Sequence, residues 1–339
     1  MLRVTPRAVA RFLAAALLGA ALGASAHAAE TLKIGVLKLA SSGPVFIAAE
    51  QGYFQAEGID ASLVYFDAAQ PVAVATVSGD IDVGVTGLTA GFYNLAAKGT
   101  LRIIGGQSRE QPGYHLIGYL AGNHAFDAGL KTLGDLPGHS VGVTQVGSTF
   151  HYSLGLLAEK LNFSLERVRI VPLQSMSNVA SAIEGNQVDA ALLPGTVATP
   201  LVAKGAAHLL GWVGDETPWQ LGAVFAGRKT IAERGPVLAS FLKAYRRGLH
   251  DFYDAFLVKA PDGNTRPGPH EKEMLAILAK YTGQRPEQIE QAIPYVDPEG
   301  RLLVRDIYHQ VAWYQSQGLV EKGIDVSALL DYSLVVDAK

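Results

Sequence analysis

The feature that most constrains the fold is an alternation of short apolar runs with longer helical stretches, which occurs twice along the chain. The first round comprises Leu32–Leu37, Pro44–Gln55, Ala61–Phe66, Pro71–Ser78, Ile81–Thr86, Thr89–Lys98 and Leu101–Gly106. The second comprises Ser140–Thr144, Ser148–Leu161, Val168–Leu173, Ser177–Glu184, Val188–Leu193, Val197–Lys204 and His208–Val213. Strands that alternate with helices are typical of α/β units with a parallel sheet. The chain is therefore predicted to build two such units.

A local echo supports duplication. Gly79-Asp80-Ile81-Asp82-Val83-Gly84 in the first round corresponds to Gly185-Asn186-Gln187-Val188-Asp189-Ala190 in the second. In both, a glycine ends a helix and a buried strand follows, which is common chemistry at a helix C-terminus. The position of the echo, at the same point of each round, is what favours two related units.

The segments between and after the two rounds indicate how the units are connected. Tyr114–Ala121 lies between the rounds and Gln220–Ala226 follows the second, and both read as strands. Two passes of the chain between two lobes are the simplest interpretation. We expect a first lobe of residues 29–124 and 217–339, which includes C-terminal helices, and a second lobe of residues 125–216.

The N-terminal 28 residues have the pattern of a cleaved export signal. Arginines at positions 3, 7 and 11 precede an apolar run from Phe12 to Leu22, and small residues follow it. The run is shorter than the roughly 20 residues that span a bilayer. With no cysteine in the chain, a lipid anchor on cysteine is excluded. These features predict a periplasmic protein of a Gram-negative cell, without membrane insertion.

Composition narrows the function classes. The absence of cysteine removes disulfides, thiolate metal sites and cysteine nucleophiles, and the histidines lack metal-ligand spacing. A net charge of −3 over 339 residues shows no basic stripe for nucleic acid. We expect a monomer without cofactor, metal or nucleic-acid partner.

Candidate ligand contacts follow the strands. In open α/β sheets, ligands bind beyond the carboxyl ends of strands, where helix N-termini offer free N–H groups and a partial positive charge. Three turns fit this position: Ser41-Ser42-Gly43-Pro44, Thr86-Gly87-Leu88-Thr89 and Gly147-Ser148-Thr149. Together they predict a cleft for an anionic or strongly accepting group.

Other side chains near these turns suggest an organic ligand. Arg109, after the strand Leu101–Gly106, is a candidate counter-charge for a carboxylate or sulfonate. Candidate aromatic walls are Phe92, Tyr93, Tyr114, Phe150, His151 and Trp212, although ordinary core packing is an equally simple explanation for several of them.

Several common enzyme motifs are absent from the sequence after residue 28. We find no Gly-x-Gly-x-x-Gly after a strand, no phosphate-binding loop and no His-Glu-x-x-His. His250 and Asp254 are four residues apart on an expected helix, which indicates an exposed pair. The chain is predicted not to be an enzyme.

Four segments together resemble a known family. Gly52-Tyr53-Phe54-Gln55-Ala56-Glu57-Gly58-Ile59-Asp60, Ser78-Gly79-Asp80-Ile81-Asp82, Leu133-Gly134-Asp135-Leu136-Pro137-Gly138 and Gly147-Ser148-Thr149-Phe150-His151-Tyr152 are similar, in order and spacing, to segments of the nitrate, sulfonate, taurine and thiamine-precursor binding proteins. The resemblance covers roughly residues 32 to 199. It implies a type II periplasmic binding fold, with two doubly wound α/β lobes on a two-segment hinge and a ligand cleft between them.

The same resemblance implies a function and partners. Such proteins deliver a small ligand to an ABC permease and ATPase, and the implied ligand is an organic anion such as a sulfonate, a taurine-like compound or an aromatic carboxylate. A neutral thiamine-precursor pyrimidine and a ligand-presenting sensory role remain alternatives. The chain departs from the family at Leu193-Pro194-Gly195-Thr196, where many relatives have a tryptophan, an acidic residue and a proline. Pro194 and Gly195 are therefore candidate ligand contacts with a changed cleft wall.

Overall fold

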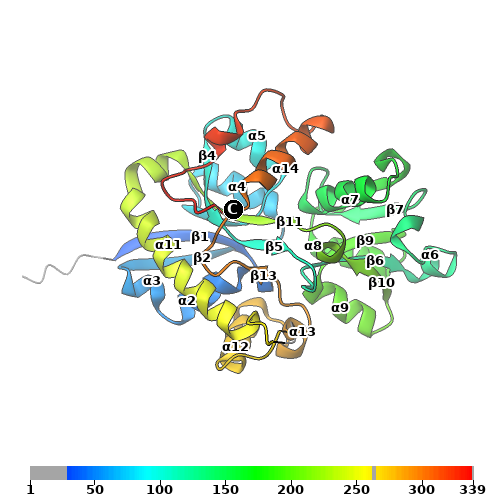
Figure 1. Cartoon of the computed structure of the whole chain (residues 1–339), viewed down its shortest axis with the longest axis horizontal. Coiled ribbons are helices and arrows are strands. Elements are labelled where there is room, and N and C mark those ends of the chain that lie inside the picture. The colour runs from blue at the N-terminus through cyan, green and yellow to red at the C-terminus, as the bar shows by residue number, and fades with distance from the viewer. Residues whose placement is uncertain (1–28, 262–264, 338–339) are drawn as a thin grey trace, which may run out of the picture.

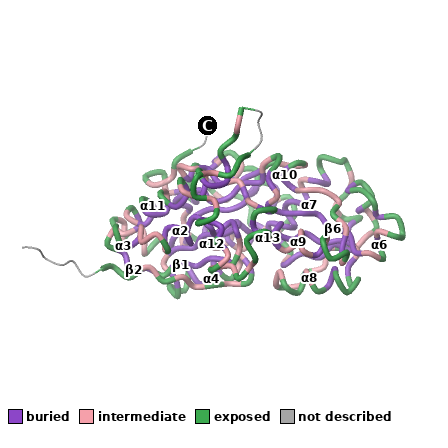
Figure 2. Tube along the Cα trace, turned by 90° about the horizontal axis from the view of Figure 1, so that it is seen from below, coloured by how far each residue is buried: buried purple, intermediate pink, exposed green. Residues whose placement is uncertain are grey.

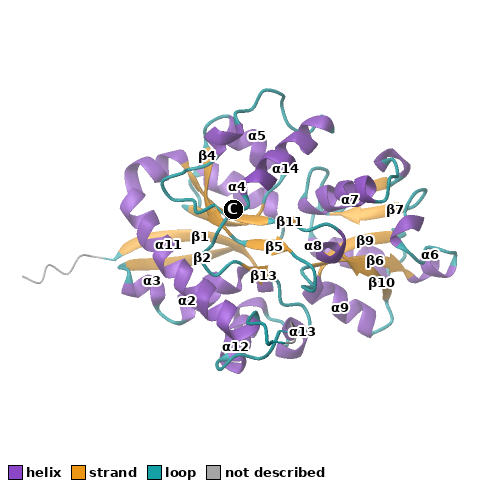
Figure 3. Cartoon of the chain, viewed as in Figure 1, coloured by secondary structure: helices purple, strands orange, loops and turns teal. Residues whose placement is uncertain are grey.

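The computed structural model describes residues 29–261 and 265–337 as two lobes, each built on a five-stranded sheet with helices on its faces (Figures 1 and 3). The proposed export signal, residues 1–28, lies outside the described residues. The first sheet has the order β2 (Ile59–Phe66), β1 (Glu30–Leu37), β3 (Val83–Gly87), β12 (Gly222–Gly227) and β4 (Leu101–Gly106). The second has the order β8 (Arg169–Pro172), β7 (Ser140–Val143), β9 (Ala190–Pro194), β6 (Ile117–Gly122) and β10 (Ala207–Trp212).

The two sheets have the same plan. In each, the first three strands of the order are parallel and the fourth runs antiparallel to both of its neighbours. This equivalence confirms the predicted pair of α/β lobes. The sheets are mixed rather than purely parallel, because the antiparallel fourth strand of each comes from the chain segment that has just crossed between lobes.

Strand pairing assigns β6 to the second sheet rather than to the first. The predicted first lobe, residues 29–124, includes β6, but β6 pairs with β9 and β10 of the second sheet. Conversely, β12 pairs with β3 and β4 of the first sheet. Backbone pairing with strands far away in sequence decides which sheet a strand joins, and a strand's own sequence does not carry that information.

A small third sheet joins the lobes. It has the order β11 (Trp219–Gln220), β5 (Ser108–Glu110) and β13 (Tyr295–Val296). β5 lies on the outward pass from the first lobe and β11 on the return pass, so the two predicted passes are present. The sequence analysis did not predict β13, which adds a strand from the C-terminal region.

Helices cover both faces of each large sheet. In the first lobe α2 (Gly43–Glu50), α3 (Tyr53–Ala56), α11 (Arg228–Phe256) and α12 (Glu271–Thr282) form one layer, and α4 (Ala69–Ser78) and α5 (Ala90–Ala97) form the other. In the second lobe α7 (Thr149–Lys160) covers one face, and α8 (Met176–Glu184) and α9 (Gly195–Ala203) cover the other (Figure 1). The shorter helices are α6 (Asn123–Asp127), α10 (Val213–Glu216) and α13 (Pro286–Glu290), with 3-10 turns at 40–42, 133–135, 165–167 and 326–329.

Strand periodicity explains how these layers divide the core. Along β9, Ala190 and Leu192 pack toward α7, whereas Ala191 and Leu193 pack toward α8 and α9. Successive side chains of a strand point to opposite faces, so a run that is apolar at every position must be covered on both sides. Figure 2 accordingly shows buried chain running through the centre of both lobes. Among the described residues, no helix is long and apolar enough to cross a membrane.

Helix α14 (Val304–Ser316) packs against both lobes, between α5 and α7. The Tyr93 hydroxyl of α5 donates to Oε1 of Gln310 at 2.8 Å, and the Tyr314 hydroxyl donates to the carbonyl of Ser148 at 3.2 Å. Trp313 packs directly on Gly155 of α7, where a Cβ would lie 2.0 Å from the indole ring. The C-terminal part of the chain therefore ties the N-terminus of α7 to the first lobe.

The sequence echo has a structural counterpart in two aspartates. Asp82 accepts a hydrogen bond from the backbone N–H of Lys33 at 2.8 Å, and Asp189 accepts one from the backbone N–H of Ser140, also at 2.8 Å. Each carboxylate thus binds the neighbouring strand at the start of β3 or β9. Ser140 adds a hydroxyl bond to Asp189 at 2.8 Å and accepts from its N–H at 2.9 Å.

These contacts determine the charge state of Asp189. Partial burial raises the pKa of its carboxyl, but the hydrogen bonds from Ser140 and the nearby His139 ring outweigh burial, so the pKa lies below the usual 3.8. A carboxyl whose pKa is lowered by folding stabilises the protein above its ordinary pKa, and this contribution is lost as the pH falls through the folded-state value.

We expect Asp189→Asn to lower the free energy of unfolding at pH 7 by about 1 kcal/mol, because the carboxylate is partly exposed and its bonds are partly screened. The difference from wild type should shrink as the pH falls below the ordinary carboxyl range. Denaturant unfolding at several pH values measures both effects, with Asp127→Asn on the exposed end of α6 as the control. A constant difference down to pH 2 would contradict the assignment.

Candidate functional site

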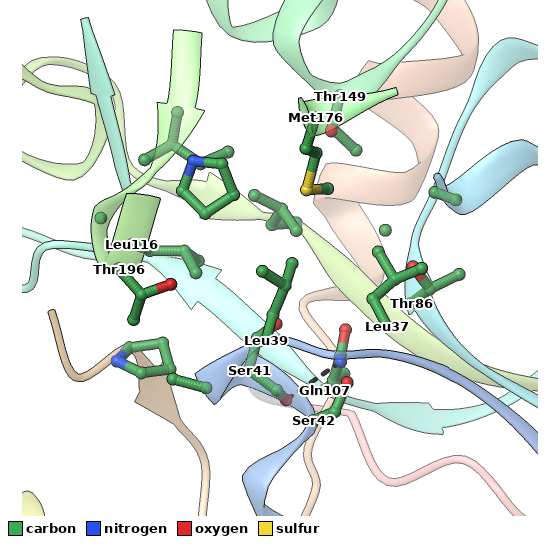
Figure 4. A pocket seen from close by; sticks show the side chains of 18 of the residues that line it. Leu37, Leu39, Ser41, Ser42, Thr86, Gln107, Leu116, Thr149, Met176 and Thr196 are labelled. Carbon is green, nitrogen blue, oxygen red and sulfur yellow. Dashed lines mark hydrogen bonds between the residues drawn. The ribbon is translucent and has the colours of Figure 1, made fainter. Parts of the chain in front are cut away.

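A cavity lies between the lobes, where the carboxyl ends of strands from both sheets face each other (Figure 4). The first lobe contributes the end of β1, the turn before α2 and the end of β3. The second contributes the N-termini of α7, α8 and α9. The lining residues are Leu37, Leu39, Ala40, Ser41, Ser42, Ala69, Thr86, Gly87, Gln107, Leu116, Ile117, Thr149, Phe150, Met176, Pro194, Gly195, Thr196, Leu221, Ala292 and Pro294.

Three side-chain hydroxyls of the lining are buried without a hydrogen-bond partner among the described residues. They are Ser42 Oγ, Thr86 Oγ1 and Thr196 Oγ1. Ser42 occupies the N-cap position of α2 but its side chain makes no capping bond there. Buried hydroxyls in folded proteins are nearly always paired, so three unpaired ones around one cavity indicate a place for polar groups of a ligand or water.

The remaining wall is uncharged and mostly apolar. Within the described part of the chain, no Asp, Glu, Lys, Arg or His lines the cavity. Phe150, Leu39, Leu116, Met176 and Pro294 are among its apolar residues. Predominantly apolar walls with a few polar groups are typical of sites for small organic molecules.

Close contacts between the lobes leave little space. The cavity volume is about 50 Å³, which is room for a few water molecules. The backbone N–H of Ala90 donates to the carbonyl of Gly147 across the lobes at 2.9 Å. At Gly87 a Cβ would lie 2.7 Å from Thr149 Cγ2 of the opposite lobe, so glycine permits this approach. An organic ligand can therefore enter only if the lobes separate.

Eight of the fifteen predicted site residues line the cavity: Ser41, Ser42, Thr86, Gly87, Thr149, Phe150, Pro194 and Gly195. The helix ends at α2 and α7 meet as the strand-end rule predicted. Gly195 opens α9 in the tightest part of the wall, since a Cβ there would lie 2.0 Å from the carbonyl oxygen of His115.

Arg109 lies in the sheet that joins the lobes rather than in the cavity wall. Its Nε donates to Gln220 Oε1 at 3.0 Å and its Nη2 donates to the Arg301 carbonyl at 2.5 Å. The carboxylate of Asp297 supplies the counter-charge, with its Oδ2 at 3.7 Å from Nη2 of Arg109. This buried guanidinium therefore has structural partners, which nothing in the local sequence signals.

The other six predicted residues also lie outside the cavity wall. Thr89 caps α5, accepting from the Phe92 N–H at 3.1 Å, and Leu88 is fully buried in the core. Gly43 faces Phe252, and Trp212 stacks on His115 with ring centroids 4.4 Å apart.

Ser148 and His151 belong to the start of α7. The Ser148 hydroxyl accepts from the His151 N–H at 3.4 Å, and His151 Nδ1 accepts from the Gly147 N–H at 3.0 Å. Burial lowers the pKa of His151 to about 4, so its ring is neutral at pH 7. Ser148 and His151 therefore stabilise the first turn of α7, and the two residues between them, Thr149 and Phe150, line the cavity.

Sequence reasoning missed Gln107, Thr196 and Met176 as polar or polarisable members of the lining. Thr196 follows Pro194 and Gly195 at the end of β9, so the strand-end rule could have identified it. Gln107 lies between β4 and β5 and carries no such signal. It reaches the cavity because the chain turns there from the first sheet toward the second lobe.

Comparisons with solved structures show which proteins share this two-lobed fold. It is similar to the alkanesulfonate-binding protein SsuA from Xanthomonas axonopodis pv. citri bound to MOPS, at 21% identity and a TM-score of 0.71, over 89% of this chain and 98% of that one. It is also similar to the periplasmic nitrate-binding protein NrtA from Synechocystis PCC 6803, at 14% identity and a TM-score of 0.69, over 88% and 84% of the two chains.

An enzyme shares the same architecture. The desulfurization enzyme DszB matches at 14% identity and a TM-score of 0.62, over 89% of this chain and 96% of that chain. At these identities the likeness shows the fold, a two-lobed periplasmic binding architecture, and the fold alone does not fix a function. A comparison with curated proteins found no match.

A family model matches a longer part of the chain than the four sequence segments span. The model of the family described as NMT1/THI5 like matches residues 40–255, which is more than half of the chain and includes both lobes. The chain therefore belongs to the NMT1/THI5-like family.

Proposed function

We propose that this protein is the substrate-binding component of an ABC-type importer, and that it holds a small organic molecule in the cavity between its lobes. The observation that carries the proposal is the set of unpaired hydroxyls of Ser42, Thr86 and Thr196 around an otherwise apolar space. The similarity to SsuA and NrtA supports it, since their names describe an alkanesulfonate-binding protein and a periplasmic nitrate-binding protein. A permease and an ATPase are the partners that this role requires.

The lining favours binding over catalysis. Among the described lining residues there is no histidine, carboxylate, lysine or cysteine that could act as a general base or nucleophile. Two histidines adjoin lining residues in sequence, but neither lines the cavity: His115 Nδ1 lies 3.1 Å from the Gln291 carbonyl oxygen, and His151 contacts Gly147 and Trp313. DszB shows that the architecture is compatible with enzymes, so the argument rests on the side chains rather than on the fold.

Two ligand classes fit different parts of the cavity. An organic anion, such as a sulfonate or an aromatic carboxylate, is favoured by the N-termini of α7 and α9, where Thr149 and Thr196 lie. Each helix end stabilises an anion by about 0.3–1 kcal/mol, and by up to about 2 kcal/mol in favourable geometry. A neutral molecule, such as a thiamine-precursor pyrimidine, is favoured by the absence of a cationic side chain from the wall, since burying an unpaired charge costs several kcal/mol.

The proposed setting is the periplasm, with residues 1–28 removed on export and the remaining chain acting as a monomer. The boundaries of the lobes are proposed to follow the hinge sheet, so that β6 belongs to the second lobe and β12 to the first.

Removing the unpaired hydroxyls of Thr86 and Thr196 should lower ligand affinity without lowering the stability of the protein. We expect Thr86→Val and Thr196→Val to leave the melting temperature unchanged or raised, because the free protein loses no hydrogen bond. Ligand affinity should fall about two- to tenfold for a neutral ligand and about ten- to a hundredfold for an anion. Calorimetric titration and thermal unfolding measure the two effects. Thr199→Val is the matched control, because the Thr199 hydroxyl is also buried and unpaired among the described residues but does not line this cavity. Unchanged affinity in both variants would contradict the site.

Ligand binding should also close the lobes. Native mass spectrometry of the protein purified from periplasm identifies any bound small molecule, and small-angle scattering before and after its removal measures the change. We expect a larger radius of gyration without ligand, because hinge motion is the common way for two lobes to enclose a ligand. The same radius of gyration in both states would argue for a rigid protein and against this proposal.

A further inference from the structure

Among the described residues of the cavity wall, Gln107 places the strictest demand on the hydrogen-bonding groups of a ligand. It is 3% exposed and lies in the turn between β4 and β5, where the chain leaves the first sheet for the hinge. Its backbone N–H donates to the carbonyl of Gly222 at 3.1 Å, which fixes its position beside the start of β12. The side chain is therefore held by the scaffold and not by a mobile loop.

The orientation of the Gln107 amide follows from its partner. Nε2 donates to the carbonyl oxygen of Ser41 at 3.0 Å (Figure 4). A carbonyl oxygen can only accept, so the NH₂ group and not the oxygen must face Ser41. The amide oxygen Oε1 then lies on the other side of the group, beside Gly222, and no donor of the described residues bonds to it. Unlike the three unpaired hydroxyls it is not fully enclosed, as expected for an atom at the cavity surface.

Gly222 makes room for this oxygen. A Cβ at Gly222 would lie 1.9 Å from Gln107 Oε1, so any other residue there would displace the amide. The unpaired hydroxyl of Thr86 and the apolar side chains of Leu37 and Leu39 belong to the same wall. The oxygen is thus fixed at an apolar surface of the cavity.

An amide oxygen differs from the hydroxyls of the site. Ser42, Thr86 and Thr196 can each rotate to donate or to accept, so they place no demand on the ligand. Gln107 Oε1 accepts only. When a ligand buries this acceptor without offering a donor, its affinity falls about five- to a hundredfold, which is enough for a site to reject analogues that lack the donor.

We propose that Gln107 determines specificity by requiring an N–H or O–H donor on the ligand. This inference rests on the proposed function and narrows its substrate class. Groups that only accept, such as nitrate or an unsubstituted alkanesulfonate, leave Oε1 unpaired and face it with like partial charge. Amides, ring amines and hydroxylated compounds satisfy it while their apolar bodies contact the wall.

Three compounds of nearly equal shape distinguish the effect of a hydrogen-bond donor on the ligand from the effect of the ligand's charge. Benzamide is neutral with N–H donors, acetophenone is neutral with a methyl group in place of the NH₂ and has no donor, and benzoate is an anion that only accepts. Each compound is titrated at millimolar concentration into the ligand-free wild-type protein, and binding is monitored by ligand-observed NMR. Benzamide should bind about tenfold or more tightly than either of the other two compounds. Equal or tighter binding of benzoate or acetophenone, or no binding of benzamide, would overturn the inference.

The variant Gln107→Met tests the residue itself. It keeps the length of the side chain and removes the acceptor, so the ratio of benzamide affinity to acetophenone affinity should fall toward one. A purely structural role would weaken both compounds alike and leave the ratio unchanged, which would overturn the assignment. Gln55→Met on the exposed α3 is the matched control.

The ligand that copurifies with the protein gives a readout that does not depend on a folded variant. A copurified compound with an N–H or O–H group supports the inference, and one without either overturns it. In the second case lobe closure with that compound would still support the proposed function, so the two failures are distinguishable.

Discussion

The insertion of the second lobe between two strands of the first sheet is the constraint on which the rest of the structure depends. β12 completes the first sheet only after the chain has built the whole second sheet, whose strands β6 to β10 are contiguous in sequence. β6 and β12, which follow the two crossings between the lobes, each form antiparallel ladders with two neighbours. The lobes therefore cannot be separated as independent halves of the chain, and the segments that enter these strands form the hinge.

The cavity follows from this arrangement. The connections into β6 and β12 carry Leu116, Ile117 and Leu221 along the floor of the site, while the carboxyl ends of β1, β3 and β9 supply residues from both lobes. Gln107 lies on the outward connection and Ser41 at the end of β1, so their hydrogen bond ties the hinge to the wall of the first lobe. The same turn of chain thus positions both the hinge and the polar group that faces the ligand space.

Helix α14 adds a second link between the lobes. Its contacts reach α5 through Gln310 and α7 through Trp313 and Tyr314. Because α7 begins with Thr149 and Phe150 at the cavity, a movement of the lobes changes the packing of α14 as well as the width of the site. The aromatic residues near this junction are structural: Tyr93, Tyr152 and Tyr314 are almost completely buried, and Phe150 is the only aromatic side chain among the described lining residues.

The sequence by itself determined the class of fold, the two related units and the two crossings between lobes, and it predicted eight of the twenty residues that line the cavity. These depend on local patterns: apolar strands, helix starts after strand ends, and the turns at Ser42, Thr86 and Thr149. Only the tertiary structure decided the sheet to which β6 belongs, the structural role of Arg109 and the presence of Gln107 in the site. Strand partners, buried ion pairs and the direction of a side chain at a crossing depend on residues distant in sequence, such as Asp297 for Arg109 and Gly222 for Gln107. A local pattern carries no record of such partners, because they meet only when the two lobes assemble.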